Sequence, residues 1–508
     1  MTLKDKILIF FIAYFALQLL ITDNYISTSD EGTHAIIGLF YKDLIYNLKN
    51  FHSLNDIIKF GINYLVKYPK ISLYYPPLYY VFLAIAFMIQ ESVIVVRILN
   101  ILLTLLTSYI IYKLSYEFFE KEWPSVLSSI FFLSFSLIFF YADKIMIDTT
   151  QILLFSTALL YYVKIKKMKV QDIRTKNIVL LSILVSLSFL VKFYSIFLPI
   201  IILIDSFLKD KKFFKKIVIS LILSGLIVSP YVFLYYKTNL YKMTFGKSLY
   251  EYSSNLVYFD VFLNFGIFLG LFVSISTAYF FYKNRKHYLF FIWLFIPLIV
   301  LLFLGNKSPR YAFILMPIYA MACGFTLSKI KEWSASKKRN LLIIIIIVLL
   351  VLQMSYNVYE NSKDVIYPVD EVMKPIKKEG NILILSEDPV YSSIFTFYGR
   401  INQVPGNIIR PCFFWKNNLT KESLNDWDIR YIIDQENNIS DELINSLNLQ
   451  NLWEKTTENK TFRLFETMGN ISKVDCNFIC VFNDKVCKDQ SITDVIKLIN
   501  KNVYINSD

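Results

Sequence analysis

The chain has 508 residues, of which 55% are hydrophobic and only 18% are charged. Its mean hydropathy of +0.47 lies well above that of soluble domains, so the composition excludes a soluble globular protein. The formal net charge of +13 does not indicate nucleic-acid binding, because most Lys and Arg residues lie in short loops between apolar runs, where they orient membrane spans. We predict a polytopic α-helical membrane protein.

Eleven apolar segments have about the length that a helix needs to cross the hydrocarbon core, roughly 20 residues with a range of about 17–25. In chain order these predicted spans are 7–22, 93–113, 124–141, 149–163, 177–191, 193–208, 217–236, 260–282, 288–304, 311–328 and 341–357. The first has no convincing small-residue cleavage site, so we do not treat it as a removable signal. Together the spans predict a transmembrane domain over residues 1–357.

The apolar stretch 78–90 is only about a dozen residues long, which indicates a helix lying at the interface rather than a crossing. If it does not cross and the N-terminus is cytoplasmic, four loops with 19 Lys and Arg residues fall inside, and the opposing short loops carry 7. Counting it as a span would violate the positive-inside rule. We therefore predict that the first external loop covers 23–92 with one or two interfacial helices, and that the C-terminus lies outside.

Asp30 and Glu31 open this first external loop, directly after the first predicted span. Exposed acids beside a span are usually only solvated, but ionisable groups at a membrane boundary also mark functional sites. Further along the loop, tyrosines flank a Pro-Pro pair in the segment that contains Tyr75. The prolines end the preceding structure and aim the following helix, and the tyrosines suit lipid headgroups and sugar rings.

Other ionisable residues lie at the predicted outer ends of spans. They are Arg97, the turn residues Asp143, Lys144 and Asp148, then Lys192, and Arg310, the last followed by Tyr311. For any single basic residue, snorkelling to the interface is a sufficient explanation. Acids and bases gathered on one side instead predict a shared polar cavity, in which Arg and Lys hold phosphate oxygens and a carboxylate deprotonates an incoming hydroxyl or amine.

Residues 358–508 are polar, and short β-like runs alternate there with helical stretches such as Ser491–Asn500. The predicted strands are Asn381–Glu387, Ile429–Gln435, Thr461–Glu466 and Phe478–Asn483. This pattern predicts a soluble α/β domain of ordinary size.

Two features place this C-terminal region outside the cell. Asn-x-Ser/Thr triplets occur at Asn418, Asn438, Asn459 and Asn470, although such triplets also arise by chance. Four cysteines, Cys412, Cys476, Cys480 and Cys487, form an even set that allows two disulfides, with metal binding as the rival interpretation. The fifth, Cys323, lies within a span and is predicted to be a small buried hydrophobe.

Several short motifs follow one another in a recognisable order. Asp30-Glu31 precede a Pro-Pro-Leu-Tyr segment, and a Val-Arg pair ending in Arg97 lies in the second span. A short turn ending in Asp148, Lys192 at the end of a later span, and Arg310-Tyr311 before a Pro-containing span come next. In this order and spacing, roughly the first 330 residues resemble the GT-C glycosyltransferases, specifically the group of protein O-mannosyltransferases and lipid A aminoarabinose transferases.

The resemblance implies a GT-C-like fold and an enzyme that moves a sugar from a polyprenyl (dolichyl-type) phosphate to a protein, lipid or glycan acceptor, with inversion at the anomeric carbon. It implies that Asp30 is the general base and that Glu31 supports it. The residues that it places at the phosphate or elsewhere in the cavity are Arg97, Asp148, Lys192, Arg310 and Tyr311.

The chain also departs from this group. Tyr75 stands where many members have His or Lys before the Pro-Pro pair, so a phosphate contact is left for Lys67 or Lys70 to fill. The Trp-Trp-Asp-Tyr-Gly motif of oligosaccharyltransferases is absent, which argues against transfer of a whole oligosaccharide to Asn. No metal-ligand set is evident, so the prediction is no cofactor, with a divalent metal left open as the alternative.

Two other functions share some of these features. A transporter or flippase of lipid-linked sugar intermediates would need a similar polar cavity, although the inverted repeats that would favour it are not seen. A non-catalytic membrane-anchored receptor would place its function in the outer domain. We predict instead a multi-pass plasma-membrane glycosyltransferase with a cytoplasmic N-terminus, an extracytoplasmic C-terminal domain, and lipid-linked donor and acceptor as partners.

Overall fold

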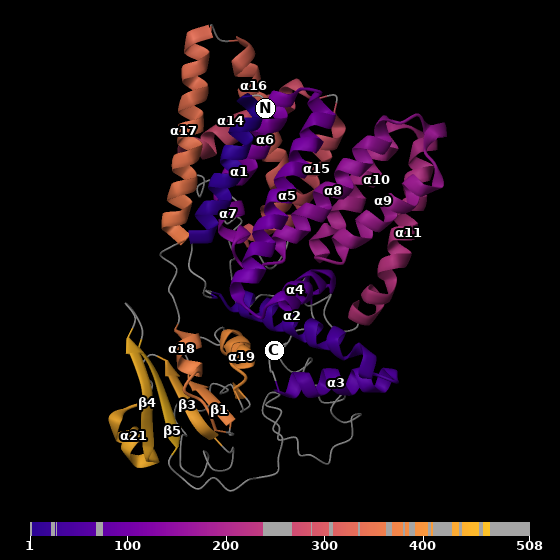
Figure 1. The fold of residues 1–508 in the computed structure, drawn as a ribbon. Helices are drawn as coiled ribbons and strands as arrows, with labels where there is room; N and C mark the ends of the chain where they lie inside the picture. Colours follow the sequence, from indigo (N-terminus) through magenta and orange to yellow (C-terminus); the bar gives the residue numbers. More distant parts are fainter. Residues whose placement is uncertain are drawn as a thin grey trace. The chain divides into compact units, whose positions relative to one another are not determined.

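The computed structural model describes residues 3–21, 26, 28–67, 75–236, 267–285, 287–303, 308–333, 336–361, 368–378, 381–385, 392–404, 408–409, 429–435, 439–456 and 461–467. The chain forms two compact units, whose elements Figure 1 labels. The first unit comprises Met1–Asp23, Tyr74–Tyr79 and Val96–Asp364. The second comprises Asn24–Leu73, Tyr80–Val95 and Val365–Asp508.

The first unit is built from helices. In chain order they are α1 (Leu3–Ile21), α5 (Val93–Phe119), α6 (Glu122–Ser134), α7 (Ser136–Ala142), α8 (Asp148–Lys167), η2 (Val170–Asp172), α9 (Thr175–Phe189), η3 (Phe193–Ile196), α10 (Phe197–Lys209), α11 (Lys211–Tyr236), α14 (Ile267–Lys283), α15 (Tyr288–Phe303), η4 (Pro309–Leu315), α16 (Met316–Trp333) and α17 (Ser336–Asn361). Each of the eleven apolar segments predicted from the sequence coincides with one helix or with two consecutive helices, as far as its residues are described.

Three helical stretches in the described ranges are long and apolar enough to cross a membrane by length and composition, namely Val93–Phe119, Lys211–Phe233 and Pro309–Ile330. The helices α6 and α7 would together make a fourth, bent by 63°. The bend lies at Phe135, whose backbone is extended between the two helices. Shorter apolar helices include Thr175–Phe189 and Tyr288–Phe303. The number of crossings and the side on which each terminus lies stay predictions.

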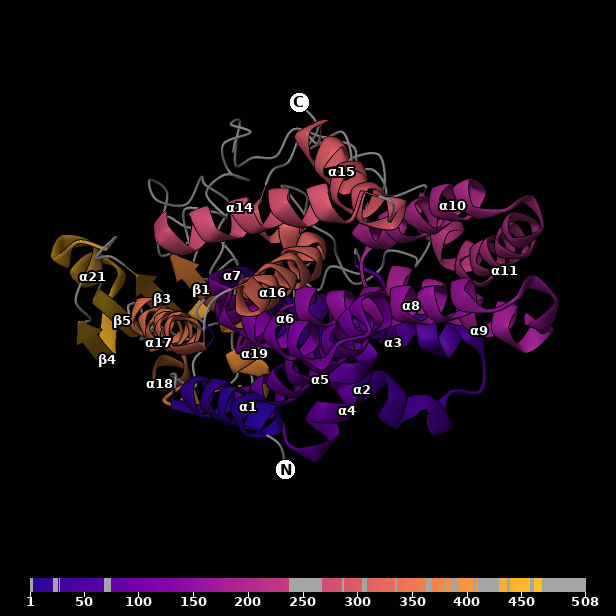
Figure 2. The same ribbon diagram turned by 90° about the horizontal axis from the view of Figure 1, so that it is seen from above.

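The helices α6 and α16 pack against each other along their lengths, and Figure 2 shows them side by side within the first unit. A Cβ at Gly324 of α16 would lie only 2.6 Å from the backbone carbonyl oxygen of Pro124. A glycine at this position therefore lets the two backbones approach closely. Every residue from Pro124 to Ser134 of α6 is buried, which places this helix in the core of the unit.

Polar residues gather at both ends of α8. At its C-terminal end, Lys166 pairs with Asp205 of α10 at 2.8 Å, and the Tyr162 hydroxyl donates a 2.6 Å hydrogen bond to the same carboxylate. The N-terminal end begins with the buried Asp148. A 20-residue helix is about 30 Å long, which is close to the thickness of the hydrocarbon core. The two polar ends of α8 are therefore separated by about the thickness of a membrane.

The second unit combines two parts of the chain. The first part contains α2 (Ser29–Asn47), η1 (Leu48–Asn50), α3 (Leu54–Lys67) and most of α4 (Leu78–Ile89). The sequence predicted one or two helices in the loop 23–92, whereas the structure has three α-helices there. The difference arises at α2, whose first turn Ser-Asp-Glu-Gly-Thr-His is polar and carries no apolar periodicity that would indicate a helix.

The other part of this unit contains a five-stranded sheet with the order β2-β1-β3-β5-β4. Its strands are β1 (Asn381–Leu385), β2 (Ile408–Ile409), β3 (Ile429–Gln435), β4 (Leu449–Thr456) and β5 (Thr461–Thr467), and its helices are α18 (Val369–Met373), α19 (Ser392–Ile401) and α21 (Asp441–Leu447). The strand β1 is parallel to β2 and β3, whereas β5 is antiparallel to both of its neighbours.

Three of these strands, β1, β3 and β5, lie where the sequence predicted β-like runs. The predicted strand Phe478–Asn483, the predicted helix Ser491–Asn500, the asparagines of the four Asn-x-Ser/Thr triplets and the four C-terminal cysteines all lie outside the described residues. Cys323 is buried, as predicted for a small hydrophobe within a helix. The division into a membrane domain over 1–357 and an outer domain over 358–508 stays a prediction.

Candidate functional site

Lys192 lies at the break between α9 and α10 in the first unit. The helix α9 ends at Phe189, and the backbone of Lys192 is extended, with φ −155° and ψ 137°, before the short helix η3. The backbone N–H of Leu78 donates a 3.0 Å hydrogen bond to the carbonyl of Leu190 in the same break. This bond ties the segment that follows Tyr75 and the Pro-Pro pair to the residues beside Lys192.

The ammonium group of Lys192 pairs with the carboxylate of Asp148, the first residue of α8. Both side chains are buried, with 6% of Lys192 and none of Asp148 exposed. In a buried pair of this kind, each charge compensates part of the cost of burying the other. The second carboxylate oxygen of Asp148, Oδ2, has no hydrogen-bond partner in the described part of the chain.

Two tyrosines flank this ion pair. The Lys192 ammonium lies 5.6 Å from the ring centroids of both Tyr194 and Tyr311, and the centroids of the two rings are 4.5 Å apart. The Arg310 guanidinium carbon lies 5.9 Å from the Tyr311 ring. Cation–π contacts at these distances favour positive charge over the ring faces. We call Asp148, Lys192, Tyr194, Arg310 and Tyr311 the Lys192 cluster.

The short helix η4 carries the two residues that reach the cluster from the C-terminal half of this unit. Ser308 is extended and Pro309 opens the helix, so Arg310 and Tyr311 lie in its first turn. The indole N–H of Trp293 in α15 donates a 3.0 Å hydrogen bond to the carbonyl of Ile314 and holds η4 against the helix bundle.

A second polar group lies beside the start of α8. The amide nitrogen of Asn100 donates hydrogen bonds to the Tyr79 hydroxyl, at 3.3 Å, and to the backbone carbonyl of Lys144. Arg97 precedes Asn100 by one turn of α5, and its side chain is buried. Lys144 is buried as well, with its ammonium 3.9 Å from the centroid of the Phe140 ring. The short turn from Lys144 to Asp148 joins this group to the Lys192 cluster.

The two groups together hold more basic than acidic side chains. The bases are Arg97, Lys144, Lys192 and Arg310, and the acids are Asp143 and Asp148. All but Arg310 are buried, and Arg310 is partly exposed. An excess of buried positive charge beside aromatic rings suits an anionic ligand such as a phosphate, which the bases would neutralise.

Asp30 and Glu31 lie in the first turn of α2, in the second unit. Glu31 is buried and makes a capping box with Thr28: its N–H donates to the Thr28 hydroxyl at 3.3 Å, and its carboxylate accepts from the Thr28 N–H at 3.2 Å. Asp30 is partly exposed. The N-terminus of a helix stabilises negative charge, so this position suits an acidic residue.

His34 lies one turn after Asp30 and is buried. Its Nδ1 makes a 2.9 Å hydrogen bond with the hydroxyl of Tyr80 at the start of α4. The Tyr41 ring stacks on Tyr80, with centroids 5.8 Å apart, and burial raises the pKa of the Tyr41 hydroxyl. These contacts orient α2 and α4 relative to each other.

The sequence of residues 74–236 matches the family described as dolichyl-phosphate-mannose-protein mannosyltransferase. The fold is similar to that of ArnT from Cupriavidus metallidurans bound to undecaprenyl phosphate, with a TM-score of 0.63 and 12% identity over 91% of this chain and 98% of that one. It is also similar to the Archaeoglobus fulgidus oligosaccharyltransferase in complex with Zn and sulfate, with a TM-score of 0.57 and 12% identity over 84% of this chain and 68% of that one.

The chain resembles the GT-C glycosyltransferases in sequence and in fold. The resemblance predicted from the order of the motifs is thereby confirmed. No curated protein matches the chain by sequence at a significant level. Identities of 12% show a shared fold alone. Proposals on the donor sugar, the acceptor and the mechanism therefore rest on the residues of this chain.

The family match contains part of the predicted site. Tyr75, Arg97, Asp148 and Lys192 fall within residues 74–236, whereas Asp30, Glu31, Arg310 and Tyr311 fall outside it. Of the predicted residues in the first unit, the structure brings Asp148, Lys192, Arg310 and Tyr311 together. Arg97 lies in the neighbouring Asn100 group, and Tyr75 is partly exposed three residues before Leu78. The catalytic roles given to these residues stay predictions.

Sequence reasoning assigned no site role to three residues that the structure joins to the predicted ones, namely His34, Asn100 and Tyr194. Asn100 carried a usable signal, because a polar amide one turn after Arg97 interrupts an apolar run. Tyr194 carried none, since tyrosines are frequent near helix ends in membrane proteins. Among the described residues, no group of three or more His, Cys, Asp or Glu side chains is placed to hold a metal ion.

Proposed function

We propose that the protein is a membrane glycosyltransferase that moves a sugar from a polyprenyl phosphate to a protein, lipid or glycan acceptor on the outer face of the membrane. The observation that carries this proposal is the Lys192 cluster, in which buried charged side chains and aromatic rings lie together at the N-terminal end of α8. The resemblance to GT-C glycosyltransferases supports it, since one neighbour of the same fold was solved with undecaprenyl phosphate bound.

The donor phosphate would bind to the basic side chains of the Lys192 cluster and the Asn100 group. Because Asp148 already compensates Lys192, we assign the most direct phosphate contact to Arg310, which is partly exposed beside Tyr311. A guanidinium donates two parallel N–H bonds to phosphate oxygens and stays charged at every physiological pH. Arg97 and Lys144 of the Asn100 group would add further positive charge.

The sugar would lie between the phosphate and the acceptor. The buried Oδ2 of Asp148, which has no hydrogen-bond partner among the described residues, is a suitable acceptor for a sugar hydroxyl. The rings of Tyr194 and Tyr311 offer apolar faces of the kind on which sugar rings stack. Asp148 would thus serve two functions, fixing Lys192 through one oxygen and recognising the sugar through the other.

The transfer step would be a single displacement with Asp30 as general base. The acceptor oxygen or nitrogen attacks the anomeric carbon, the bond from that carbon to the phosphate oxygen breaks, and the polyprenyl phosphate leaves with the bonding electron pair. The proton of the acceptor passes to the Asp30 carboxylate. Attack opposite the leaving phosphate inverts the anomeric configuration.

Glu31 and His34 would support Asp30 indirectly. Glu31 closes the capping box with Thr28, and this fixes the first turn of α2 that carries Asp30. His34 anchors the second turn through Tyr80. We therefore assign to Glu31 a positioning role rather than proton transfer.

A transfer assay tests this function. Purified protein in nanodiscs would receive dolichyl phosphate mannose or an undecaprenyl-phosphate-linked sugar, together with a membrane extract as the source of acceptors. We expect release of the polyprenyl phosphate that depends on the acceptor, and a product of inverted configuration by NMR. Movement of an intact donor across vesicles without cleavage would support a flippase instead, and a retained configuration would reject direct displacement.

A further inference from the structure

The helix α19 packs directly on the first turn of α2, although more than 350 residues separate them in the chain. A Cβ added at Gly32, two residues after Asp30, would lie 2.8 Å from the backbone nitrogen of Ile394 and from the carbonyl carbon of Ser393. Real Cβ atoms do not approach backbone atoms so closely. The absence of a side chain at Gly32 therefore allows the two backbones to touch.

The chain that leads into α2 is held by the same helix. The backbone N–H of Ile26 donates a 3.3 Å hydrogen bond to the hydroxyl of Tyr398. Residues Ser393 to Gly399 of α19 are all buried. Its C-terminal end is fixed in turn, because the amide of Asn402 donates a 2.9 Å bond to Asp370 of α18.

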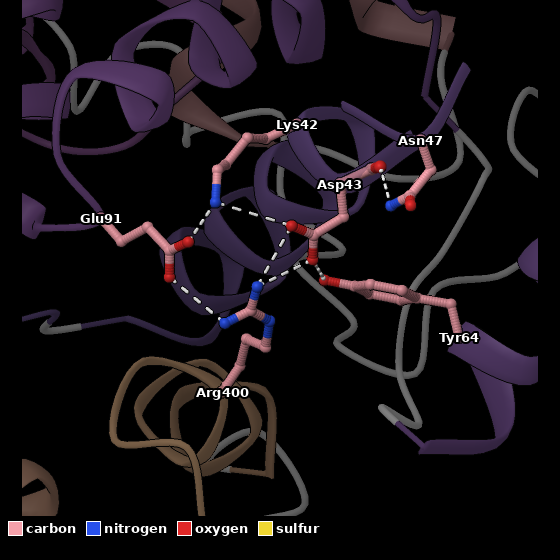
Figure 3. Close-up of polar contacts among 6 residues, drawn as sticks. All are labelled: Lys42, Asp43, Asn47, Tyr64, Glu91 and Arg400. Atoms are coloured by element: carbon pink, nitrogen blue, oxygen red, sulfur yellow. Dashed lines mark hydrogen bonds and ion pairs between the residues drawn. The ribbon is translucent and has the colours of Figure 1, made fainter. Parts of the chain in front are cut away.

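A group of ion pairs fixes the other end of the contact (Figure 3). The Arg400 guanidinium donates to both carboxylate oxygens of Asp43 in α2, at 2.9 and 3.1 Å, and to Glu91 after α4, at 3.2 Å. Lys42 pairs with Glu91, and the Tyr64 hydroxyl of α3 donates to Asp43 at 3.0 Å. Burial alone lowers the pKa of Arg400, but the bonds and charges of Asp43 and Glu91 outweigh it, so the guanidinium stays protonated.

We propose that α19 is a positioning element for the transfer reaction: by holding α2 at Gly32, at Ile26 and at Asp43, the C-terminal part of the chain fixes the carboxylate of Asp30. This inference rests on the proposed function of Asp30 as general base. It gives the C-terminal region a role in catalysis that needs no contact of its own with donor or acceptor.

The glycines of the first external loop provide a matched pair of variants. In Gly32→Ala the new methyl group would push α2 away from α19, whereas a Cβ at Gly61 in α3 would meet no atom within 4 Å. We expect Gly32→Ala to lower kcat on the order of tenfold to a hundredfold, because small displacements of a reacting group cost this much. The KM for the lipid donor should stay close to that of the wild type. Gly61→Ala should leave both parameters unchanged.

Two milder variants keep the proposal testable if Gly32→Ala does not fold. Tyr398→Phe removes the acceptor for the Ile26 N–H and should lower kcat by about two- to tenfold, the effect of one hydrogen bond. Arg400→Gln should lower kcat further. The kcat of Arg400→Lys should lie between those of Arg400→Gln and the wild type, because lysine keeps the positive charge but lacks the planar guanidinium group. A merely structural role would reduce yield and melting temperature but leave kcat per folded molecule unchanged.

Hydrogen–deuterium exchange gives a readout that needs no activity. Amides of residues 28–34 should exchange faster in Gly32→Ala and Tyr398→Phe than in the wild type, while α9 in the first unit stays unchanged. Wild-type exchange and wild-type kcat in folded Gly32→Ala would overturn the proposal. If the wild type transfers no sugar from any donor, the proposed function fails, and the exchange result still decides whether α19 holds the first turn of α2.

Discussion

The ammonium group of Lys192 is paired with the carboxylate of Asp148, and both side chains are buried between α8 and the break before η3. The two residues are 44 positions apart in the chain. The negative charge of Asp148 offsets the positive charge of Lys192 in the site. Arg310, Arg97 and Lys144 are the further sources of positive charge there. It also links the stability of the helix bundle to the residues proposed to bind the donor.

Removing one member of this pair should therefore destabilise the protein. We expect Lys192→Met to lower the free energy of unfolding by about 3–5 kcal/mol, because it leaves the buried Asp148 carboxylate without its counter-ion. The double variant Lys192→Met/Asp148→Leu should recover most of this loss but should not restore donor binding. Denaturant titration in mixed micelles measures the first effect, and binding of undecaprenyl phosphate measures the second.

Lys167 provides the control for that experiment. It pairs with Glu117 at 3.1 Å and with Glu120 at 3.4 Å, but 45% of the lysine is exposed, as are 25% of Glu117 and 78% of Glu120. Exposed pairs contribute only about 0–1 kcal/mol, so Lys167→Met should change stability little. Equal losses in Lys192→Met and Lys167→Met would contradict the account of a buried, compensated pair.

Arg310 and Arg285 form a second matched pair of variants. Each guanidinium lies over a tyrosine ring, at 5.9 Å from Tyr311 and at 5.5 Å from Tyr282, but only Arg310 belongs to the Lys192 cluster. Arg310→Ala should raise the Kd for undecaprenyl phosphate about tenfold or more, because a hydrogen bond to a charged group contributes about 1.5–3 kcal/mol. Arg285→Ala should bind the lipid like the wild type. Equal affinities in the two variants would remove Arg310 from the phosphate site.

The predicted topology can be tested at the end of α4. Gln90 is exposed and directly follows this 12-residue helix. If α4 lies at the interface and the loop 23–92 is external, Gln90→Cys should react with a membrane-impermeant maleimide in intact cells. Peptide mass spectrometry identifies the labelled position and separates it from the native cysteines. Lys169→Cys, in a loop predicted to be cytoplasmic, should react only after permeabilisation, and the reverse pattern would invert the topology.

The helical architecture could be predicted from the sequence because a helix that crosses lipid must satisfy its backbone internally and be apolar over most of its length. Each of the eleven long apolar runs accordingly coincides with helical structure. The strands β1, β3 and β5 were predictable for a related reason, since they are short runs rich in Ile, Leu and Phe. The strand β4 was missed because most of its residues are exposed and polar.

The candidate site was only partly predictable. The sequence indicated that Asp148, Lys192 and Arg310 lie at the same side of the bundle, from the alternation of loops. It could not show that Lys192 pairs with Asp148, because that contact depends on how α8 and the break before η3 pack. The contact of Arg400 with Asp43 was likewise hidden, since 357 residues separate its members and neither carries an unusual local motif.

The central claim is that Asp30 accepts the proton of the acceptor, and one comparison tests it most directly. Asp30→Asn keeps the shape of the side chain but cannot take up a proton, whereas Asp56→Asn changes a partly exposed acid of the same loop. We expect Asp30→Asn to lower turnover by about 10²–10⁴-fold, the usual contribution of a general base, with little change in the binding of undecaprenyl phosphate. Asp56→Asn should retain wild-type turnover. Near wild-type turnover in purified, folded Asp30→Asn would contradict the account.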